Sequence, residues 1–299
     1  MIPSTNSAVL PRLRRYIRRP WPEKIRAAGL YARYAIPSLP VPVRLPFGAW
    51  VLAWNDDLGN HILARDFEQP EYAFVGRFLK PGMTVLDIGA NQGLYTLLAS
   101  SRVGPKGLVI SFEPSPRERR RLHLDVWMNF CSNVRVQPVA LGATAGLMEL
   151  FVVHGGETGC NSLRPPAVKG RTSRVSVKVE TLDGFIFRHE LDRVDFIKMD
   201  VEGAEWSVLQ GAQRLFATPP RPVLLIEVYD IRTLPWGYAA REIVKHLNAL
   251  GFRIFRPTEN GGLEAEDVCK ESFDANLVAV PEERMTEVAD FLAQQGAHA

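Results

Sequence analysis

The sequence predicts an α/β fold in which helices cover both faces of a mostly parallel, doubly wound sheet. From residue 83 onward, short apolar runs rich in β-forming residues alternate with helical patterns, and a glycine-containing turn follows the first of these runs. Such runs are typical of strands buried on both faces, and their alternation with helices is typical of parallel sheets. In this architecture ligands bind beyond the carboxyl ends of the strands.

The first half of the chain supplies the opening elements of this sheet. Strands are expected at 48–54, 83–88, 107–112 and 134–139, and helices at 72–79, 93–103 and 115–129. Ser115, Pro116 and Glu118 form a capping-box pattern with proline at the first helical position, which indicates where the helix of residues 115–129 begins.

The second half contains an insertion and the closing elements. Residues 146–153 and 174–180 predict an antiparallel, hairpin-like insertion with a glycine-rich loop between its strands. Further strands are expected at 194–199, 222–228, 252–255 and 276–280, and helices at 204–216, at 239–250 and from residue 282.

We expect two regions: a basic, proline-rich extension over residues 1–70 and a catalytic domain over residues 71–299. The first fifty residues hold nine Lys/Arg and one acidic residue, Glu23. Residues 10–30 are either a solvated leader or an arm that contacts anionic lipid or an acidic partner. Nucleic acid is not an expected partner, because the basic residues do not continue into the catalytic region. Residues 1–45 are expected to be dispensable for cofactor binding.

Composition favours a cytoplasmic protein, peripheral to the membrane if the basic arm binds lipid. No run of eighteen apolar residues predicts a membrane-spanning helix, and the N-terminus lacks the apolar core of a secretory signal. The cysteines are far apart and form no CxxC pair, which favours reduced thiols; they are Cys131, Cys160 and Cys269.

The turn after the first buried strand predicts a nucleoside-cofactor site. It reads Asp87-Ile-Gly89-Ala90-Asn91-Gln-Gly93, and Glu113-Pro114 closes the next strand. Gly89 permits a sharp turn and close approach of a ligand, and Gly93 permits close helix-to-strand packing. A carboxylate at Glu113 can accept hydrogen bonds from both ribose hydroxyls. Asn91 stands where a dinucleotide site needs a glycine for the pyrophosphate, so S-adenosylmethionine fits better than NAD. The alternative is a purely structural turn.

A second motif, Lys198-Met-Asp200-Val-Glu202-Gly-Ala-Glu205, follows the strand of residues 194–199. Charge at a buried strand end is costly without a partner, so Asp200 and Glu202 are predicted to bind cofactor or acceptor and to act in catalysis. The alternative is that they only shape the turn. Glu205 is interpreted as a helix cap. Lys198 is either a catalytic base or the partner of a nearby carboxylate.

The identity of the general base stays open between Asp200, Glu202, Lys198, Glu227 and His154. We predict no metal site: three of these carboxylates could supply oxygen ligands, but nothing in the sequence fixes a coordination geometry. The insertion from Gly142 to Glu180 is expected either to form a mobile lid over the pocket or to be an ordinary hairpin.

These motifs together resemble the FkbM-type methyltransferases. The resemblance rests on residues 87–96, 112–114, 181–183, 197–205, 208–212 and 226–227, and covers roughly residues 70–285. It implies the seven-stranded, Rossmann-like methyltransferase sheet, dependence on S-adenosylmethionine and O-methylation of sugars or natural products. The expected acceptor is therefore a small molecule or a glycan. The alternatives are a nicotinamide-dependent oxidoreductase on the same sheet and a non-catalytic adapter that keeps the fold.

Overall fold

The computed structural model describes residues 39–155, 157–166 and 170–292, so residues 10–30 lie outside the described part of the chain. The chain divides into two compact units, Met1–Phe67 and Glu68–Ala299. The described part of the first unit contains an antiparallel hairpin and a helix: β1 (Val41–Arg44), β2 (Trp50–Ala53) and α3 (Asp57–Ala64). Asp56 starts α3 by accepting a hydrogen bond from the Gly59 N–H at 2.9 Å.

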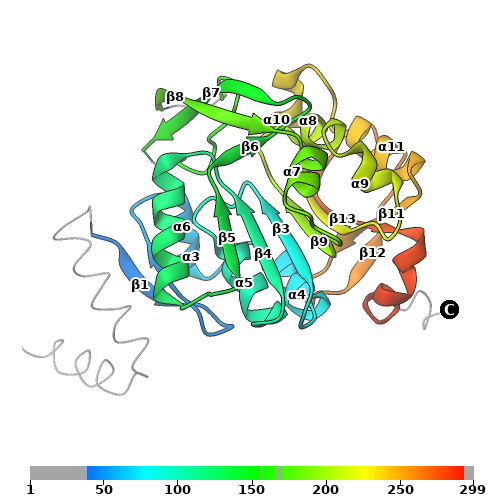
Figure 1. Cartoon of the computed structure of the whole chain (residues 1–299), viewed down its shortest axis with the longest axis horizontal. Helices are drawn as coiled ribbons and strands as arrows, with labels where there is room; N and C mark the ends of the chain where they lie inside the picture. Colours follow the sequence, from blue (N-terminus) through cyan, green and yellow to red (C-terminus); the bar gives the residue numbers. More distant parts are fainter. Residues whose placement is uncertain (1–38, 156, 167–169, 293–299) are drawn as a thin grey trace, which may run out of the picture. The chain divides into compact units, whose positions relative to one another are not determined.

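The second unit is built on an eight-stranded sheet with the order β12-β11-β13-β10-β9-β3-β4-β5 (Figure 1). The five strands from β10 to β5 are parallel, and β13, β11 and β12 extend one side antiparallel. The strands are β3 (Thr84–Ile88), β4 (Leu108–Phe112), β5 (Val134–Gln137), β9 (Phe196–Met199), β10 (Val223–Tyr229), β11 (Phe252–Pro257), β12 (Leu263–Ala265) and β13 (Asp274–Pro281). The predicted doubly wound sheet is confirmed; the expected count of seven is exceeded because β12 pairs with the end of β11.

Helices cover both faces of this sheet (Figure 1). On one face Phe78 of α4 packs on Phe196 with ring centroids 5.7 Å apart, and on the other Phe112 meets Phe185 of α7 at 4.7 Å. Both faces of the central strands are therefore buried, as their apolar sequences predict. The helices are α4 (Gln69–Phe78), α5 (Leu94–Val103), α6 (Pro116–Met128), α7 (Leu182–Arg188), α8 (Glu205–Gln210), α9 (Gln213–Ala217), α10 (Asp230–Thr233) and α11 (Arg241–Ala249), with 3-10 helices η1 (Leu234–Trp236) and η2 (Glu282–Phe291).

The insertion forms a separate three-stranded sheet of order β6-β8-β7, from β6 (Val139–Leu141), β7 (Gly146–His154) and β8 (Arg171–Glu180). β7 and β8 are antiparallel, as predicted. The single strand expected at 134–139 is wrong: it divides at Pro138 into β5 of the main sheet and β6 of the insertion. Proline has no N–H to donate to a ladder, which accounts for the break.

Three further expectations differ from the structure. The helix expected over 204–216 is divided into α8 and α9 at Gly211, and the C-terminal helix is the 3-10 helix η2. In the capping box, Ser115 donates its hydroxyl to the Glu118 side chain instead of accepting from the backbone. Among the described residues, none of the helices combines the length and the apolar composition that crossing a bilayer requires.

Candidate active site

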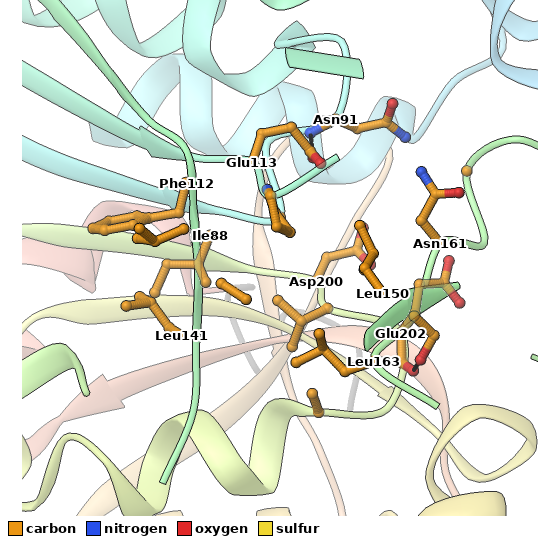
Figure 2. Close-up of a pocket in the computed structure, with 18 residues that line it drawn as sticks. Ile88, Asn91, Phe112, Glu113, Leu141, Leu150, Asn161, Leu163, Asp200 and Glu202 are labelled. Carbon is orange, nitrogen blue, oxygen red and sulfur yellow. Dashed lines mark hydrogen bonds between the residues drawn. The ribbon is translucent and has the colours of Figure 1, made fainter. Parts of the chain in front are cut away.

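A cavity lies at the carboxyl ends of β3, β4 and β9, where the sequence places its two motifs (Figure 2). Gly89, Asn91, Glu113, Pro114, Asp200 and Glu202 line it, so six of the predicted site residues come together there. Figure 2 shows Ile88, Phe112 and Leu141 gathered at one side of the cavity, with Asn91, Glu113 and Asn161 at another. The cavity thus has an apolar wall beside a group of polar side chains.

Two glycines of the turn after β3 let neighbouring parts of the chain pack closely against the turn. Gly89 has φ +81°, and a Cβ there would lie 1.8 Å from the Asp200 carbonyl oxygen. Gly93 has φ +89°, and a Cβ there would lie 2.2 Å from the Leu122 side chain of α6. The positive φ of Gly89 fits the sharp turn expected there, and its close neighbour is the Asp200 backbone. For Gly93 the expected partner needs correction, because it admits the helix α6 instead of a strand. Ala90 is not among the lining residues, and it donates its N–H to the Phe112 carbonyl at 3.0 Å.

Glu113 is the most buried carboxylate of the cavity wall, with 6% of its surface exposed. Its two oxygens accept hydrogen bonds from the backbone N–H groups of Asn91, at 2.8 Å, and Ser115, at 2.7 Å. Burial, followed by the neighbouring Glu118, raises the pKa of Glu113 to about 8, although the two N–H donors oppose this shift. A carboxylate has about four acceptor positions, so Glu113 keeps acceptor capacity for a bound ligand.

Asp87 does not line the cavity. It is 1% exposed, and its Oδ2 accepts a hydrogen bond of 2.6 Å from the Thr96 hydroxyl, which also lies 2.7 Å from Ser111. Burial raises the pKa of Asp87, and nearby Lys198 opposes the shift. The structure therefore places Asp87 beneath the turn, where it supports the start of α5.

Asp200 and Lys198 form an ion pair, with Nζ and Oδ2 2.6 Å apart. Burial alone would lower the pKa of Lys198, but the carboxylates of Asp200, Glu68 and Asp87 outweigh it and raise that pKa. A lysine that holds its proton this firmly cannot accept another group's proton, so the geometry favours the ion-pair alternative over the base for Lys198. Asp200, in contrast, faces the cavity (Figure 2).

Glu202 pairs with Arg232 of α10, with Oε2 and Nε 3.0 Å apart. Burial, and after it the charge of Asp200, raises the pKa of Glu202 to about 8. The residue has φ +54°, a left-handed backbone that is uncommon for glutamate. Its position at the cavity wall is thus held by an ion pair and by a strained turn together.

Glu205 stabilises the same turn. Its Oε1 accepts from the backbone N–H groups of Val201, at 2.9 Å, and Gly203, at 3.3 Å. Burial raises the pKa of Glu205 to about 7 against these hydrogen bonds. The carboxylate caps backbone groups of the turn before α8, close to the helix-capping role expected for it.

The insertion covers one side of the cavity through its loop. Gly159, Asn161, Ser162 and Leu163 line the wall, and the Ser162 hydroxyl donates to the Glu202 carbonyl at 3.0 Å. Arg164 donates to the Pro235 carbonyl at 2.8 Å. These bonds tie residues 157–166 to the turn after β9 and to η1. His154 lies at the end of β7, exposed, with its Nε2 2.8 Å from the Ser173 hydroxyl and outside the cavity wall.

Two further carboxylates lie near the site: Glu68, which had no signal in the sequence motifs, and Glu227, one of the candidate bases. Glu68 accepts a hydrogen bond of 2.5 Å from the Tyr95 hydroxyl, and the Tyr95 ring lies 5.1 Å from Lys198 Nζ. Burial raises the pKa of Glu68 to about 7, and Lys198 opposes the shift. Burial, followed by Asp200, also raises the pKa of Glu227. Within the described ranges, no three or more His, Cys, Asp or Glu are arranged to hold a metal ion.

Comparison with known proteins connects this geometry to one family. A family model described as "Methyltransferase FkbM domain" matches residues 87–254, more than half of the chain. The matched range contains both motifs, the insertion and the cavity wall.

Three curated relatives are similar to this chain. "AMB antimetabolite synthetase AmbE" of Pseudomonas aeruginosa is 27% identical over 245 residues, which are 71% of this chain and 11% of that protein. "2-O-methyltransferase NoeI" of Sinorhizobium fredii is 28% identical over 148 residues, 45% of this chain and 59% of the relative. "31-O-demethyl-FK506 methyltransferase FkbM" of Streptomyces tacrolimicus is 25% identical over 238 residues, 71% of this chain and 88% of the relative.

The chain thus spans a ninth of the length of the first of these relatives and over half of the second. The family assignment rests on the domain match, which covers more than half of the chain and includes the two motifs at the cavity. The chain belongs to the FkbM methyltransferase family.

Proposed function

We propose that this protein is an S-adenosylmethionine-dependent O-methyltransferase that acts on a hydroxyl group of a sugar, glycolipid or natural-product acceptor. The observation that carries the proposal is that Glu113 and Asp200, from two different strands, line one cavity. The printed names of two relatives, a 2-O-methyltransferase and a 31-O-demethyl-FK506 methyltransferase, support O-methylation.

The residues of the cavity fit an adenosyl cofactor. Glu113 retains acceptor positions for ribose hydroxyls, because each of its oxygens carries one backbone hydrogen bond. The apolar side formed by Ile88, Phe112 and Leu141 suits a flat purine ring. We therefore assign the ribose to Glu113 and the base to this apolar side. Pro114 completes the wall beside Glu113.

The chemistry supplied by the bound cofactor is an activated methyl group on a positively charged sulfur. Transfer to an alcohol requires that the acceptor oxygen be aligned with that carbon and that its proton be removed. Asp200 faces the cavity as the partner of a firmly protonated lysine, so it is available to accept a hydrogen bond from the acceptor hydroxyl. Glu202, paired with Arg232, provides a second carboxylate on the same wall.

Two measurements test the proposal. S-adenosylhomocysteine should raise the melting temperature of the full chain while NAD leaves it unchanged, because only a ligand of the folded state stabilises it. Radiolabelled methyl from S-adenosylmethionine should then enter hydroxylated acceptors from a panel of glycosides, glycolipids and polyketides. A methyl ether keeps the label after mild alkali, whereas a methyl ester releases it as methanol. Label that resides on nitrogen or is lost to alkali would contradict O-methylation of a hydroxyl.

A further inference from the structure

The outer face of α6 displays large apolar side chains that stay substantially exposed. Trp127 is 71% exposed, Phe130, just beyond the helix end, is 88% exposed, and Leu124 is 36% exposed. Positions three and four apart on a helix are neighbours, so Leu124 and Trp127 form one stripe with Arg120. We call Arg120, Leu124, Trp127 and Phe130 the α6 stripe. The helix α6 that carries this stripe lies beside the edge strand β5 (Figure 1).

The backbone at Phe130 adopts a conformation that is strained for a bulky residue. Phe130 has φ +54°, and its N–H donates to the Trp127 carbonyl at 3.1 Å as the helix ends. Glycine or asparagine usually occupies this left-handed position, and a bulky residue there is an outlier. An exposed phenylalanine recovers none of this cost through burial in the folded chain. Backbone strain that brings no gain in packing is typical of functional positions.

Within residues 99–137, which include the stripe, the exposed charged residues are all basic. Residues 99–137 contain seven Lys/Arg and three acidic residues. The acidic residues Glu113, Glu118 and Asp125 are each at most 6% exposed. Exposed Arg135 follows on β5, and the Asn133 side chain donates to the Gly104 carbonyl at 2.8 Å, which brings exposed Lys106 of the next turn into this region.

We propose that the α6 stripe docks on an anionic lipid bilayer. Aromatic side chains at the headgroup level, flanked by Lys/Arg, are the composition of interfacial membrane contacts. Within residues 99–137 no acidic residue is exposed, so a surface of anionic headgroups is complementary to the exposed basic residues there.

Trp127 and Phe130 lie at the end of α6 that is far from the cavity. α6 begins at Pro116, two residues after the cavity residue Pro114, and its thirteen residues carry the chain about 18 Å to its other end. Substitution of Trp127 or Phe130 is therefore expected to leave the binding of S-adenosylhomocysteine unchanged.

Vesicle flotation of the full chain tests this proposal, with vesicles of phosphatidylcholine alone and of phosphatidylcholine mixed with phosphatidylglycerol. The chain should float with the anionic vesicles only. Trp127→Ser and Phe130→Asn should each weaken that binding by about tenfold, the effect of losing one buried aromatic side chain. Phe187→Ser is the matched control: Phe187 is 76% exposed on α7, so its loss should change nothing.

Phe130→Asn gives a second readout. Asparagine accepts the left-handed backbone, so this variant should melt at a higher temperature than the natural chain while it binds vesicles less well. A structural role for Phe130 predicts a lower melting temperature instead. The proposal is overturned if the natural chain ignores anionic vesicles, which would indicate a protein partner, or if the Phe187 control loses as much binding as the two stripe variants.

Discussion

Replacing Glu113 by alanine should weaken cofactor binding without abolishing the fold. Glu113 is assigned to the ribose, and hydrogen bonds to a charged group contribute about 1.5–3 kcal/mol each when they replace hydration. Part of this favourable contribution is offset, because the charged carboxylate is costly to bury, as the rise of its pKa to about 8 indicates. A net loss of about 1–3 kcal/mol is expected, which is about a 5- to 150-fold rise in the dissociation constant of S-adenosylhomocysteine.

Isothermal titration calorimetry measures this change, and Glu118→Gln is the matched control. Glu118 is a neighbouring buried carboxylate, 1% exposed, that contacts Ser115 and Arg117 but does not line the cavity. Its neutralisation removes a charge that raises the pKa of Glu113, so affinity should be no weaker than in the natural chain. An unchanged dissociation constant in Glu113→Ala, with normal melting, would refute the ribose assignment.

Three further outcomes follow from the site. Asp200→Asn should lower turnover by about tenfold or more while cofactor affinity is nearly kept. Full turnover in a stable variant would rule out a catalytic role. Kinetics, calorimetry and thermal melting, measured on one preparation, distinguish the two results. Folding raises the pKa of buried Glu113 from 4.5 to about 8 and of Glu205 to about 7, so the folded state binds more protons. The free energy of unfolding, from urea titrations, should therefore fall as pH rises from 4.5 through 8, and a rise in stability would contradict these shifts. Gly89→Ala should melt well below Gly82→Ala, because both glycines have positive φ but only a Cβ at Gly89 meets the Asp200 backbone; equal melting would show that the close contact is unimportant.

The sequence predicted the parts of the fold that local pattern decides. The buried strands β3, β4, β9 and β10 are short apolar runs, and their order along the chain with helices between them determines a parallel sheet. The break at Pro138 was missed in the sequence. After it the chain leaves the main sheet and joins the smaller one, and this depends on which strands lie nearby in the folded protein. β12 has three residues and pairs only at an edge, so it has almost no periodic signal.

In the candidate site, too, residues placed by local sequence pattern were predicted, whereas residues placed by tertiary packing were missed. Glu113 and Asp200 directly follow buried strands, and Glu202 comes two residues after Asp200. All three were predicted because strand ends on one side of a parallel sheet converge. Asp87 lies within such a strand, one residue before its end, and points to Thr96 instead of the cavity. Arg232, the partner of Glu202, comes from a short helix thirty residues later, so only tertiary packing brings the two together.

A crystal structure of the full chain with S-adenosylhomocysteine bound tests the proposed cofactor site most directly. The ribose hydroxyls are expected to donate to the Glu113 carboxylate, with the sulfur on the side of Asp200. The purine should lie against Ile88, Phe112 and Leu141. A ribose held elsewhere, with Glu113 contacting only the backbone N–H groups of Asn91 and Ser115, would contradict the account.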